Sequence, residues 1–259
     1  MSEDSARDLE EASRVLEIEA RAIQNLSRRL GDSFVKAIDL LLGCEGKVVI
    51  SGMGKSGHIG RKIASTMAST GTPAFFLHPA ESSHGDLGVI GLKDVLIAIS
   101  NGGETPELQD MIRFAARKGI PLIGITGAMK SSLAKASTVA LDISVDEEAC
   151  PLGLAPTASS TVTLALGDAL AMCLLKRRGF KEEDFAEYHP GGKLGRRLLT
   201  RVEDVMHSGD GLALVELNTN MRDVINLMTR KEVRGIAGVV DDKQNLIGVI
   251  TDGDLRRRL

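Results

Sequence analysis

The stretch Val48-Val49-Ile50-Ser51-Gly52-Met53-Gly54-Lys55-Ser56-Gly57 decides the fold of this chain. An apolar run ends in a glycine- and serine-rich turn that carries one lysine, and a helical pattern follows. This order is typical of a parallel-sheet protein that presents backbone N–H groups and a cation to an anion. A second such turn, Ser100-Asn101-Gly102-Gly103-Glu104-Thr105, follows the apolar run Val95–Ile99. Two turns at the same ends of two strands predict a phosphorylated ligand held between them.

The composition is that of an ordinary soluble globular protein. The chain has 259 residues, of which 43% are hydrophobic and 26% charged, enough for one large domain or a medium domain with a small one. A net charge of −3, one Tyr, six Phe and no Trp argue against nucleic-acid binding. The three cysteines, Cys44, Cys150 and Cys173, lack paired spacing and indicate reduced thiols. With no signal-peptide pattern at the acidic N-terminus, a cytoplasmic location is expected.

Helical and strand patterns alternate along most of the chain. Helices are expected at residues 3–30, 33–42, 58–69, 106–118 and 160–178, and strands at 47–50, 74–77, 95–99, 122–126 and 139–145. Continuous β-branched runs alternating with helices predict a parallel sheet covered on both faces, a three-layer α/β/α fold of the flavodoxin-like or Rossmann-like kind. The apolar segment 159–175 contains Asp168 and many small residues, and is expected to be a buried helix rather than a membrane span.

The pattern changes near residue 200, where a domain boundary is expected. The first domain would cover residues 1–199 and the second 200–259. A segment at 202–206, a helix over 221–231 and strands at 236–240 and 246–250 predict a compact β-α-β-β unit. The glycine-rich loop 188–195 is expected to be the hinge between the two domains.

The first turn has three alternative interpretations. The spacing Gly52-x-Gly54-x-x-Gly57 matches the dinucleotide fingerprint in letter and context. Two features oppose a dinucleotide: Lys55 occupies the turn, and Glu81 lies beyond a proline, a poor place for a ribose-binding carboxylate. A nucleotide P-loop would need glycine where Val49 stands. The third alternative is a tight strand-to-helix turn with a solvated lysine.

The second turn offers hydroxyls, an amide and N–H groups at the start of a helix, whose positive dipole end favours a phosphate dianion. The groups expected to hold the phosphate are Ser56, Ser100, Asn101, Gly102 and Thr105. Ser100 and Thr105 could also serve as helix N-caps, and both roles can coexist. Glu104 could equally be a first-turn glutamate that stabilises the helix dipole.

Four motifs together resemble the D-arabinose 5-phosphate isomerase family, and the likeness covers essentially the whole chain. They are Gly52-Met53-Gly54-Lys55-Ser56-Gly57-His58-Ile59-Gly60, Glu81-Ser82-Ser83-His84-Gly85-Asp86-Leu87, Ala149-Cys150-Pro151-Leu152-Gly153-Leu154-Ala155-Pro156-Thr157 and His189-Pro190-Gly191-Gly192. The last two are far more specific than any glycine motif. The resemblance implies a sugar isomerase (SIS) domain joined to cystathionine-β-synthase (CBS) modules. It also implies a homotetramer with active sites between subunits.

The resemblance further implies a reversible aldose–ketose isomerisation of D-ribulose 5-phosphate and D-arabinose 5-phosphate. The product would supply 3-deoxy-D-manno-octulosonate for lipopolysaccharide. The family's functional residues fall on Lys55, Glu104, Glu148 and His189, with His84 near the sugar. At Gly102 many relatives carry serine, so one phosphate-facing hydroxyl is lost here.

The C-terminal segment resembles a single CBS module, half of the usual pair. In the run Gly248-Val249-Ile250-Thr251-Asp252-Gly253-Asp254, Thr251 and Asp254 fit the positions that hold a nucleotide ribose. The alternative is that these two residues cap a C-terminal helix. We therefore do not expect a complete nucleotide site in this module.

The reaction that the resemblance implies needs a base to move a proton between C1 and C2 through an enediolate, and a cation for the developing oxyanion. We assign the proton shuttle to Glu148, with Glu104 as the competing candidate. Lys55 would stabilise the oxyanion or the phosphate, and His189 would assist proton transfer at the oxygens, from a neighbouring subunit in one version of the scheme. No metal or other cofactor is needed, and the Cys and His spacing is not that of a structural zinc site.

Three other functions fit parts of the sequence. A non-catalytic sugar-phosphate sensor would use the same sheet and turns but would not need Glu148 or His189. A nucleotide-binding regulatory module would depend on the C-terminal domain. A dinucleotide oxidoreductase fits least well, for the reasons given for the first turn.

Overall fold

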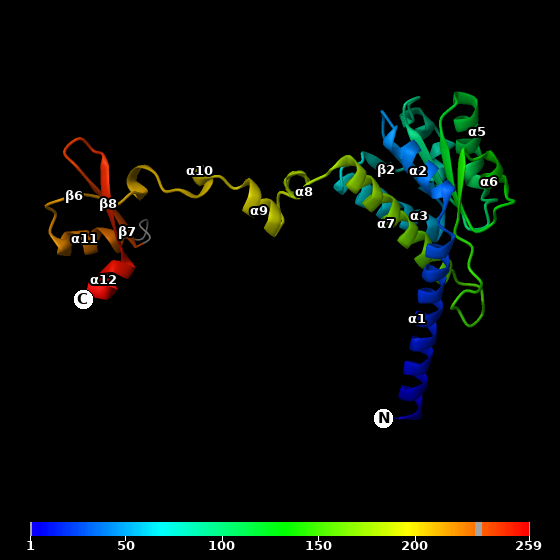
Figure 1. The fold of residues 1–259 in the computed structure, drawn as a ribbon, viewed down its shortest axis with the longest axis horizontal. Coiled ribbons are helices and arrows are strands. Elements are labelled where there is room, and N and C mark those ends of the chain that lie inside the picture. Colours follow the sequence, from blue (N-terminus) through cyan, green and yellow to red (C-terminus); the bar gives the residue numbers. More distant parts are fainter. Residues whose placement is uncertain (1, 231–234, 259) are drawn as a thin grey trace. The chain divides into compact units, whose positions relative to one another are not determined.

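The computed structural model describes residues 2–230 and 235–258 (Figure 1). Contacts between Cα atoms divide the chain into two compact units, Met1–Leu198 and Leu199–Leu259. Each unit has its own sheet and its own apolar core.

The first unit is built on a five-stranded parallel sheet with the strand order β2-β1-β3-β4-β5. Its strands are β1 (Val48–Gly52), β2 (Ala74–Phe76), β3 (Val95–Ile99), β4 (Leu122–Thr126) and β5 (Val139–Asp142). Every residue of β1, β3 and β4 is buried, which explains why these strands have continuous apolar runs. In the register, Ile50 lies between Phe76 of β2 and Ile97 of β3.

Helices cover both faces of this sheet, so the predicted α/β/α fold is confirmed. Val48 and Ile50 point into one core with α1 (Glu3–Arg29), α2 (Asp32–Leu42), α3 (Gly54–Ser69) and α7 (Ala158–Arg178). The intervening Val49 points into the other core, with η2 (Pro106–Leu108), α5 (Gln109–Lys118) and α6 (Ser132–Ala136). This alternation follows from the two-residue period of a strand.

The remaining elements of the first unit are short. After β2 come α4 (Pro79–Ser82) and η1 (Asp86–Val89), and after α7 come α8 (Glu182–Tyr188) and α9 (Lys193–Leu199). The loop expected at 188–195 is therefore shorter, because α9 already includes Gly195.

Helix α7 packs in the centre of the helical layer. By length and composition it could cross a membrane, and it is the one such helix in the described residues. It contacts α1, α2 and α3, and it approaches α3 so closely at Gly167 that an added Cβ would lie 2.3 Å from Cγ1 of Ile63. The prediction that this segment is a buried core helix is confirmed.

The second unit contains a three-stranded sheet and two flanking helices. Its elements are α10 (Val202–Val205), η3 (Gly209–Gly211), β6 (Leu214–Glu216), α11 (Met221–Met228), β7 (Ile236–Val240), β8 (Leu246–Thr251) and α12 (Asp252–Arg258). Strand β7 lies in the middle, parallel to β6 and antiparallel to β8.

Two sequence predictions need correction in these units. The first strand of the second unit is β6 rather than the segment at 202–206, which forms α10 because Asp204 accepts a hydrogen bond from the backbone of Arg201 and caps the helix. In the first unit, α3 begins at Gly54 rather than near residue 58, so Lys55 and Ser56 lie in its first turn.

Candidate active site

The strand order places a crevice at one point of the sheet edge. Chain connections run in opposite directions from β1 and β3, and ligands of open α/β sheets bind beyond the carboxyl ends of the strands at such a switch point. Both glycine-rich turns start there, because β1 ends at Gly52 and β3 ends at Ile99.

A pocket of about 220 Å³ opens at this point. It is lined by Met53, Lys55, Ser56, Ile59, Asn101, Pro156, Ser159, Ser160 and Thr163. The structure therefore brings together three predicted site residues, Lys55, Ser56 and Asn101. The other lining residues were not predicted as site residues. Ser159, Ser160 and Thr163 could have been found from the sequence, because they lie in the first turns of the helix that follows the 149–157 motif.

The first turn presents the N-terminus of α3 to the pocket. Among the described residues no side chain caps this helix, so its first N–H groups remain available. The helix can start this close to β1 because residue 57 is glycine: an added Cβ would lie 2.5 Å from the carbonyl oxygen of Gly52. The exposed Lys55 and half-buried Ser56 thus stand at a positive helix end.

Hydrogen bonds within the second turn, residues 100–105, fix its shape. Oγ of Ser100 lies 2.7 Å from Oγ1 of Thr105 and accepts a hydrogen bond from the backbone N–H of Gly103. Ser100 is buried, whereas Asn101 is exposed and lines the pocket. Gly102 has open space around it, since no atom lies within 4 Å of an added Cβ. Ser100 and Thr105 therefore shape the turn, and Asn101 lines the pocket.

Glu148 lies directly behind the pocket wall and caps α7. Its Oε2 accepts hydrogen bonds from Thr157 N at 2.7 Å, Thr157 Oγ1 at 3.0 Å and Ser159 N at 3.2 Å, and its Oε1 accepts one from Ser159 Oγ. Burial raises the pKa of Glu148, but these hydrogen bonds outweigh burial and hold the pKa below its ordinary value. The carboxylate is therefore ionised, and both of its oxygens accept hydrogen bonds.

Glu104 has a different environment from Glu148. It is exposed, and its Oε1 accepts a hydrogen bond, 2.7 Å long, from the backbone N–H of Ser132 at the start of α6. Hydrogen bonding with Ser132 lowers the pKa of Glu104. Glu104 is not one of the lining residues of the pocket, but it lies three residues after Asn101 in the same turn.

The two predicted histidines also lie outside the pocket lining. His84 is exposed in the turn after α4. His189 ends α8, where its Nδ1 lies 2.9 Å from the carbonyl oxygen of Phe185 and its ring stacks on that of Phe185. The 21-residue α7 separates Ser159 at the pocket from α8, a length of about 30 Å. His189 follows the far end of α7.

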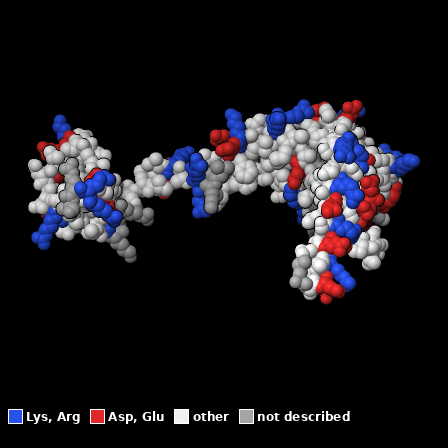
Figure 2. All heavy atoms as spheres, turned by 60° about the horizontal axis from the view of Figure 1, so that its bottom comes forward, with Lys and Arg blue, Asp and Glu red and all other residues white. Residues whose placement is uncertain are grey.

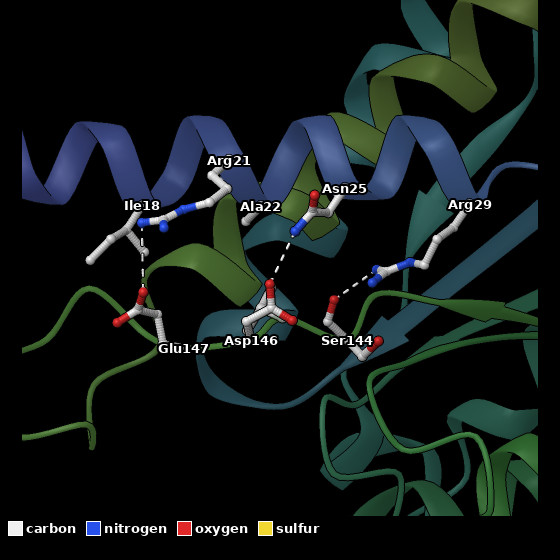
Figure 3. A pocket seen from close by; sticks show the side chains of 9 residues that line it. Ile18, Arg21, Ala22, Asn25, Arg29, Ser144, Asp146 and Glu147 are labelled. Atoms are coloured by element: carbon white, nitrogen blue, oxygen red, sulfur yellow. Dashed lines mark hydrogen bonds and ion pairs between the residues drawn. The ribbon is translucent and has the colours of Figure 1, made fainter.

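Side chains of helix α1 bind the segment that precedes Glu148 (Figure 3). Asn25 Nδ2 donates to Asp146 Oδ2 at 3.0 Å, and Arg29 donates to the carbonyl oxygen of Ser144 at 2.7 Å. Further along, Arg21 lies 3.6 Å from Glu147, and Arg14 donates to the carbonyl oxygen of Ala149 at 2.6 Å. The four α1 residues share one face of the helix, so one rigid element sets the path of the chain into Glu148.

The described residues contain no group of three or more His, Cys, Asp or Glu side chains placed to hold a metal ion. Cys44, Cys150 and Cys173 are free thiols. Acidic and basic side chains are interspersed over the visible face (Figure 2), in keeping with a net charge of −3.

In the second unit, Thr251 and Asp254 are bonded to each other. Asp254 Oδ2 accepts hydrogen bonds from the backbone and hydroxyl of Thr251 at 3.0 and 2.7 Å, and Thr251 Oγ1 accepts from the backbone of Asp254. Hydrogen bonding with Thr251 and Arg257 lowers the pKa of Asp254 to about 2. This geometry is a capping box at the start of α12, the alternative that the sequence left open.

The chain thus has a parallel α/β domain with a pocket at its switch point, followed in the sequence by a smaller domain. A family model named SIS domain matches residues 41–173, and one named CBS domain matches residues 202–259.

Comparison with named proteins identifies the family of the chain more narrowly. The chain is 57% identical to arabinose 5-phosphate isomerase KdsD of Pseudomonas aeruginosa and 52% identical to KdsD of Escherichia coli K12, in each case over 96% of this chain and 76% of the relative. A solved structure from E. coli CFT073, in complex with arabinose 5-phosphate, superposes with a TM-score of 0.69 at 42% identity, covering 73% of this chain and all of the other. A phosphosugar isomerase structure from Bacteroides fragilis gives 0.69 at 40%, covering 71% of this chain and 98% of the other. The chain belongs to the arabinose 5-phosphate isomerase family.

Proposed function

We propose that the protein interconverts D-arabinose 5-phosphate and D-ribulose 5-phosphate through an enediolate. The observation that carries this proposal is the pocket at the switch point, where the N-terminus of α3, Lys55, Ser56 and Asn101 converge. Membership of the isomerase family, and a relative solved with arabinose 5-phosphate, support the substrate class.

The phosphate would sit at the start of α3. The backbone N–H groups there, the Ser56 hydroxyl and the Asn101 amide supply donors, and the helix dipole favours a dianion. Ser100 and Thr105 hold the second turn in shape through the hydrogen bond between their hydroxyls. Gly102 would contribute its N–H group.

The proton shuttle needs a carboxylate that can accept and release a proton. Glu148 accepts four hydrogen bonds, and each of them would weaken on protonation. Glu104 is exposed and bonds to one residue, Ser132, in the described part of the chain, so it can swing toward a substrate at modest cost. Between the two candidates, this geometry favours Glu104 as the shuttle and Glu148 as the residue that positions Ser159 against the pocket.

Lys55 would stabilise the oxyanion of the enediolate or the phosphate. His189 would transfer protons at the sugar oxygens, and it would come from another copy of the chain, because α7 separates it from the pocket of its own chain. His84, near the sugar, would complete the site. We propose that the enzyme works as an oligomer because of this sharing, with the homotetramer of the family resemblance as the expected assembly.

A coupled assay that supplies ribulose 5-phosphate tests the proposal, with other pentose and hexose phosphates as competitors. Lys55→Ala should raise KM and lower kcat, whereas Lys36→Ala, an exposed change on α2, should leave both within about twofold. Binding of the sugar phosphate without any turnover would refute isomerisation and favour the sensor.

The cellular setting follows as part of the same proposal. The enzyme would act in the cytoplasm, use no cofactor, and supply arabinose 5-phosphate for 3-deoxy-D-manno-octulosonate synthesis. A nucleotide at Thr251 and Asp254 would have to break the capping box first, so thermal shift with adenine nucleotides should show no stabilisation if the cap is their whole role.

A further inference from the structure

Helix α1 carries an apolar stripe that faces solvent. Leu9, Leu16, Ile23 and Leu30 recur every seven residues, and their exposed fractions are 61%, 68%, 37% and 42%. They lie away from the face that packs inward, which is formed by Ile18, Ala22 and Leu26. A seven-residue apolar repeat over this length is the signature of a helix that packs along another helix.

A second set of residues completes the heptad. Three positions before each large residue stand Ala6, Ser13, Ala20 and Ser27. The eight positions thus alternate small and large, and none of them is charged. A small residue beside each leucine lets two helices approach closely and accept each other's large side chains.

The spacing selects an antiparallel partner of the same sequence. Antiparallel pairing of the stripe with a second copy sets Leu9 against Ser27 and Leu16 against Ala20, and by symmetry Ile23 against Ser13 and Leu30 against Ala6. Every large residue then faces a small one. A parallel pair would instead place leucine against leucine and small against small at successive levels.

The charges of α1 agree with this direction. Its N-terminal part carries Glu3, Asp4, Asp8, Glu10 and Glu11 against Arg7 and Arg14, the latter paired with Glu11, and its C-terminal end carries Arg28 and Arg29. The helix dipole accounts for charges in the first and last turns, but Asp8, Glu10 and Glu11 lie beyond the first turn. Antiparallel pairing brings Glu10 of one copy near Arg28 of the other, whereas parallel pairing would stack the acidic segments on each other.

The N-terminal part of α1 also lacks support within its own chain. Residues 3–13 are all exposed, and Figure 1 shows this part of α1 extending beyond the body of its unit. A helical segment of this length is only marginally stable alone in water, so a covering partner would stabilise it. The C-terminal part of α1 from a second copy would provide that cover.

We propose that α1 forms an antiparallel two-helix interface with α1 of a second copy, through the stripe formed by Ala6, Leu9, Ser13, Leu16, Ala20, Ile23, Ser27 and Leu30. The resulting pair is two-fold symmetric and therefore closed. It buries both exposed stripes and covers the projecting N-terminal part of each helix.

Sedimentation of the full chain tests the interface without substrate, so its outcome is independent of the proposed isomerase activity. Leu16→Glu should halve the mass of the assembly at a concentration where the wild type is assembled. Val35→Glu also puts a glutamate in place of an exposed apolar residue, at a 55% exposed position on α2, and should leave the mass unchanged. A wild-type chain that sediments as a monomer, or a Leu16→Glu variant with wild-type mass, would overturn the proposal.

Disulfide trapping tests the direction. Copies carrying Leu9→Cys are mixed with copies carrying Ser27→Cys under mild oxidation, and linked peptides are identified by mass spectrometry. The antiparallel pair gives a link between positions 9 and 27 of different copies, and neither variant links to itself at its new cysteine. A link between two copies of position 9 would show a parallel pair and would overturn the proposal, as would the absence of any link at these positions.

Discussion

Replacing Glu148 with glutamine should destabilise the first unit, because one carboxylate satisfies the start of α7. Its two oxygens accept four hydrogen bonds from Thr157 and Ser159, and an amide directs an NH2 group at some of these donors. A partly buried donor left unpaired costs about 1–3 kcal/mol, and loss of a negative charge at a helix N-terminus costs about 0.3–1 kcal/mol. We therefore expect the free energy of unfolding to fall by about 2 kcal/mol for Glu148→Gln.

The adjacent residue provides the matched control. Glu147 is exposed and lies 3.6 Å from Arg21, so Glu147→Gln should change the free energy of unfolding by less than about 0.5 kcal/mol. Urea unfolding of both full-length variants, followed by circular dichroism, measures the difference. Equal stability of the two variants would show that Glu148 does not cap α7.

The pH dependence of this difference adds a second test. The folded-state pKa of Glu148 is lowered from 4.5, so its contribution is fully present above that value and is lost as pH falls through the folded-state pKa. The gap between wild type and Glu148→Gln should therefore shrink below pH 4.5. A gap that stayed constant into acid would refute the assignment of the stabilisation to the ionised carboxylate.

Four further predictions concern single positions. Gly102→Ser should lower KM for the sugar phosphate by several-fold, because its side chain enters open space beside the proposed phosphate site. Gly103→Ser should instead destabilise the fold, because φ is 69° there and an added Cβ would lie within 3 Å of Ser131; urea unfolding and steady-state kinetics separate the two. Glu104→Gln should reduce kcat by about 10²–10⁴ while the free energy of unfolding changes little, and a kcat near wild type would remove Glu104 as the shuttle. Asp254→Asn should lower the melting temperature of the second unit, because the cap of α12 loses its charged acceptor, and an unchanged calorimetric transition would contradict this reading of the cap.

Much of the fold could be predicted because its signals are local. Continuous apolar runs such as Val95–Ile99 report burial on both faces, and the prediction of a parallel sheet with helices on both sides followed from them. The pocket between the two turns lies where the sequence placed the candidate site, since the ends of β1 and β3 carry these turns. The strand β6 was missed because Leu214–Glu216 is only three residues long and shows no clear alternation.

The hydrogen-bond partners of the site residues could not be predicted in the same way. Nothing near Ser100 in the sequence shows that its hydroxyl is bonded inside the turn, and nothing near Glu148 shows that Ser159, eleven residues later, donates to it. The contact of Ser100 with Thr105 forms when the turn after β3 closes, and the contacts of Glu148 form when the segment after β5 folds back onto the start of α7. The choice between Glu104 and Glu148 as the shuttle therefore depends on tertiary structure.

Helix α1 joins assembly to the site through its two faces. One face holds the segment before Glu148 through Arg21, Asn25 and Arg29, and the other carries the stripe with Leu16 and Ile23. Because a continuous helix moves as a rigid rod over this length, an interface that orders the stripe also steadies the segment that Glu148 ends. In the proposed scheme His189 comes from another copy, so assembly would supply one group to the site and hold another in place. A variant that loses the α1 interface should therefore have a lower kcat, while the free energy of unfolding of its separated chain changes little.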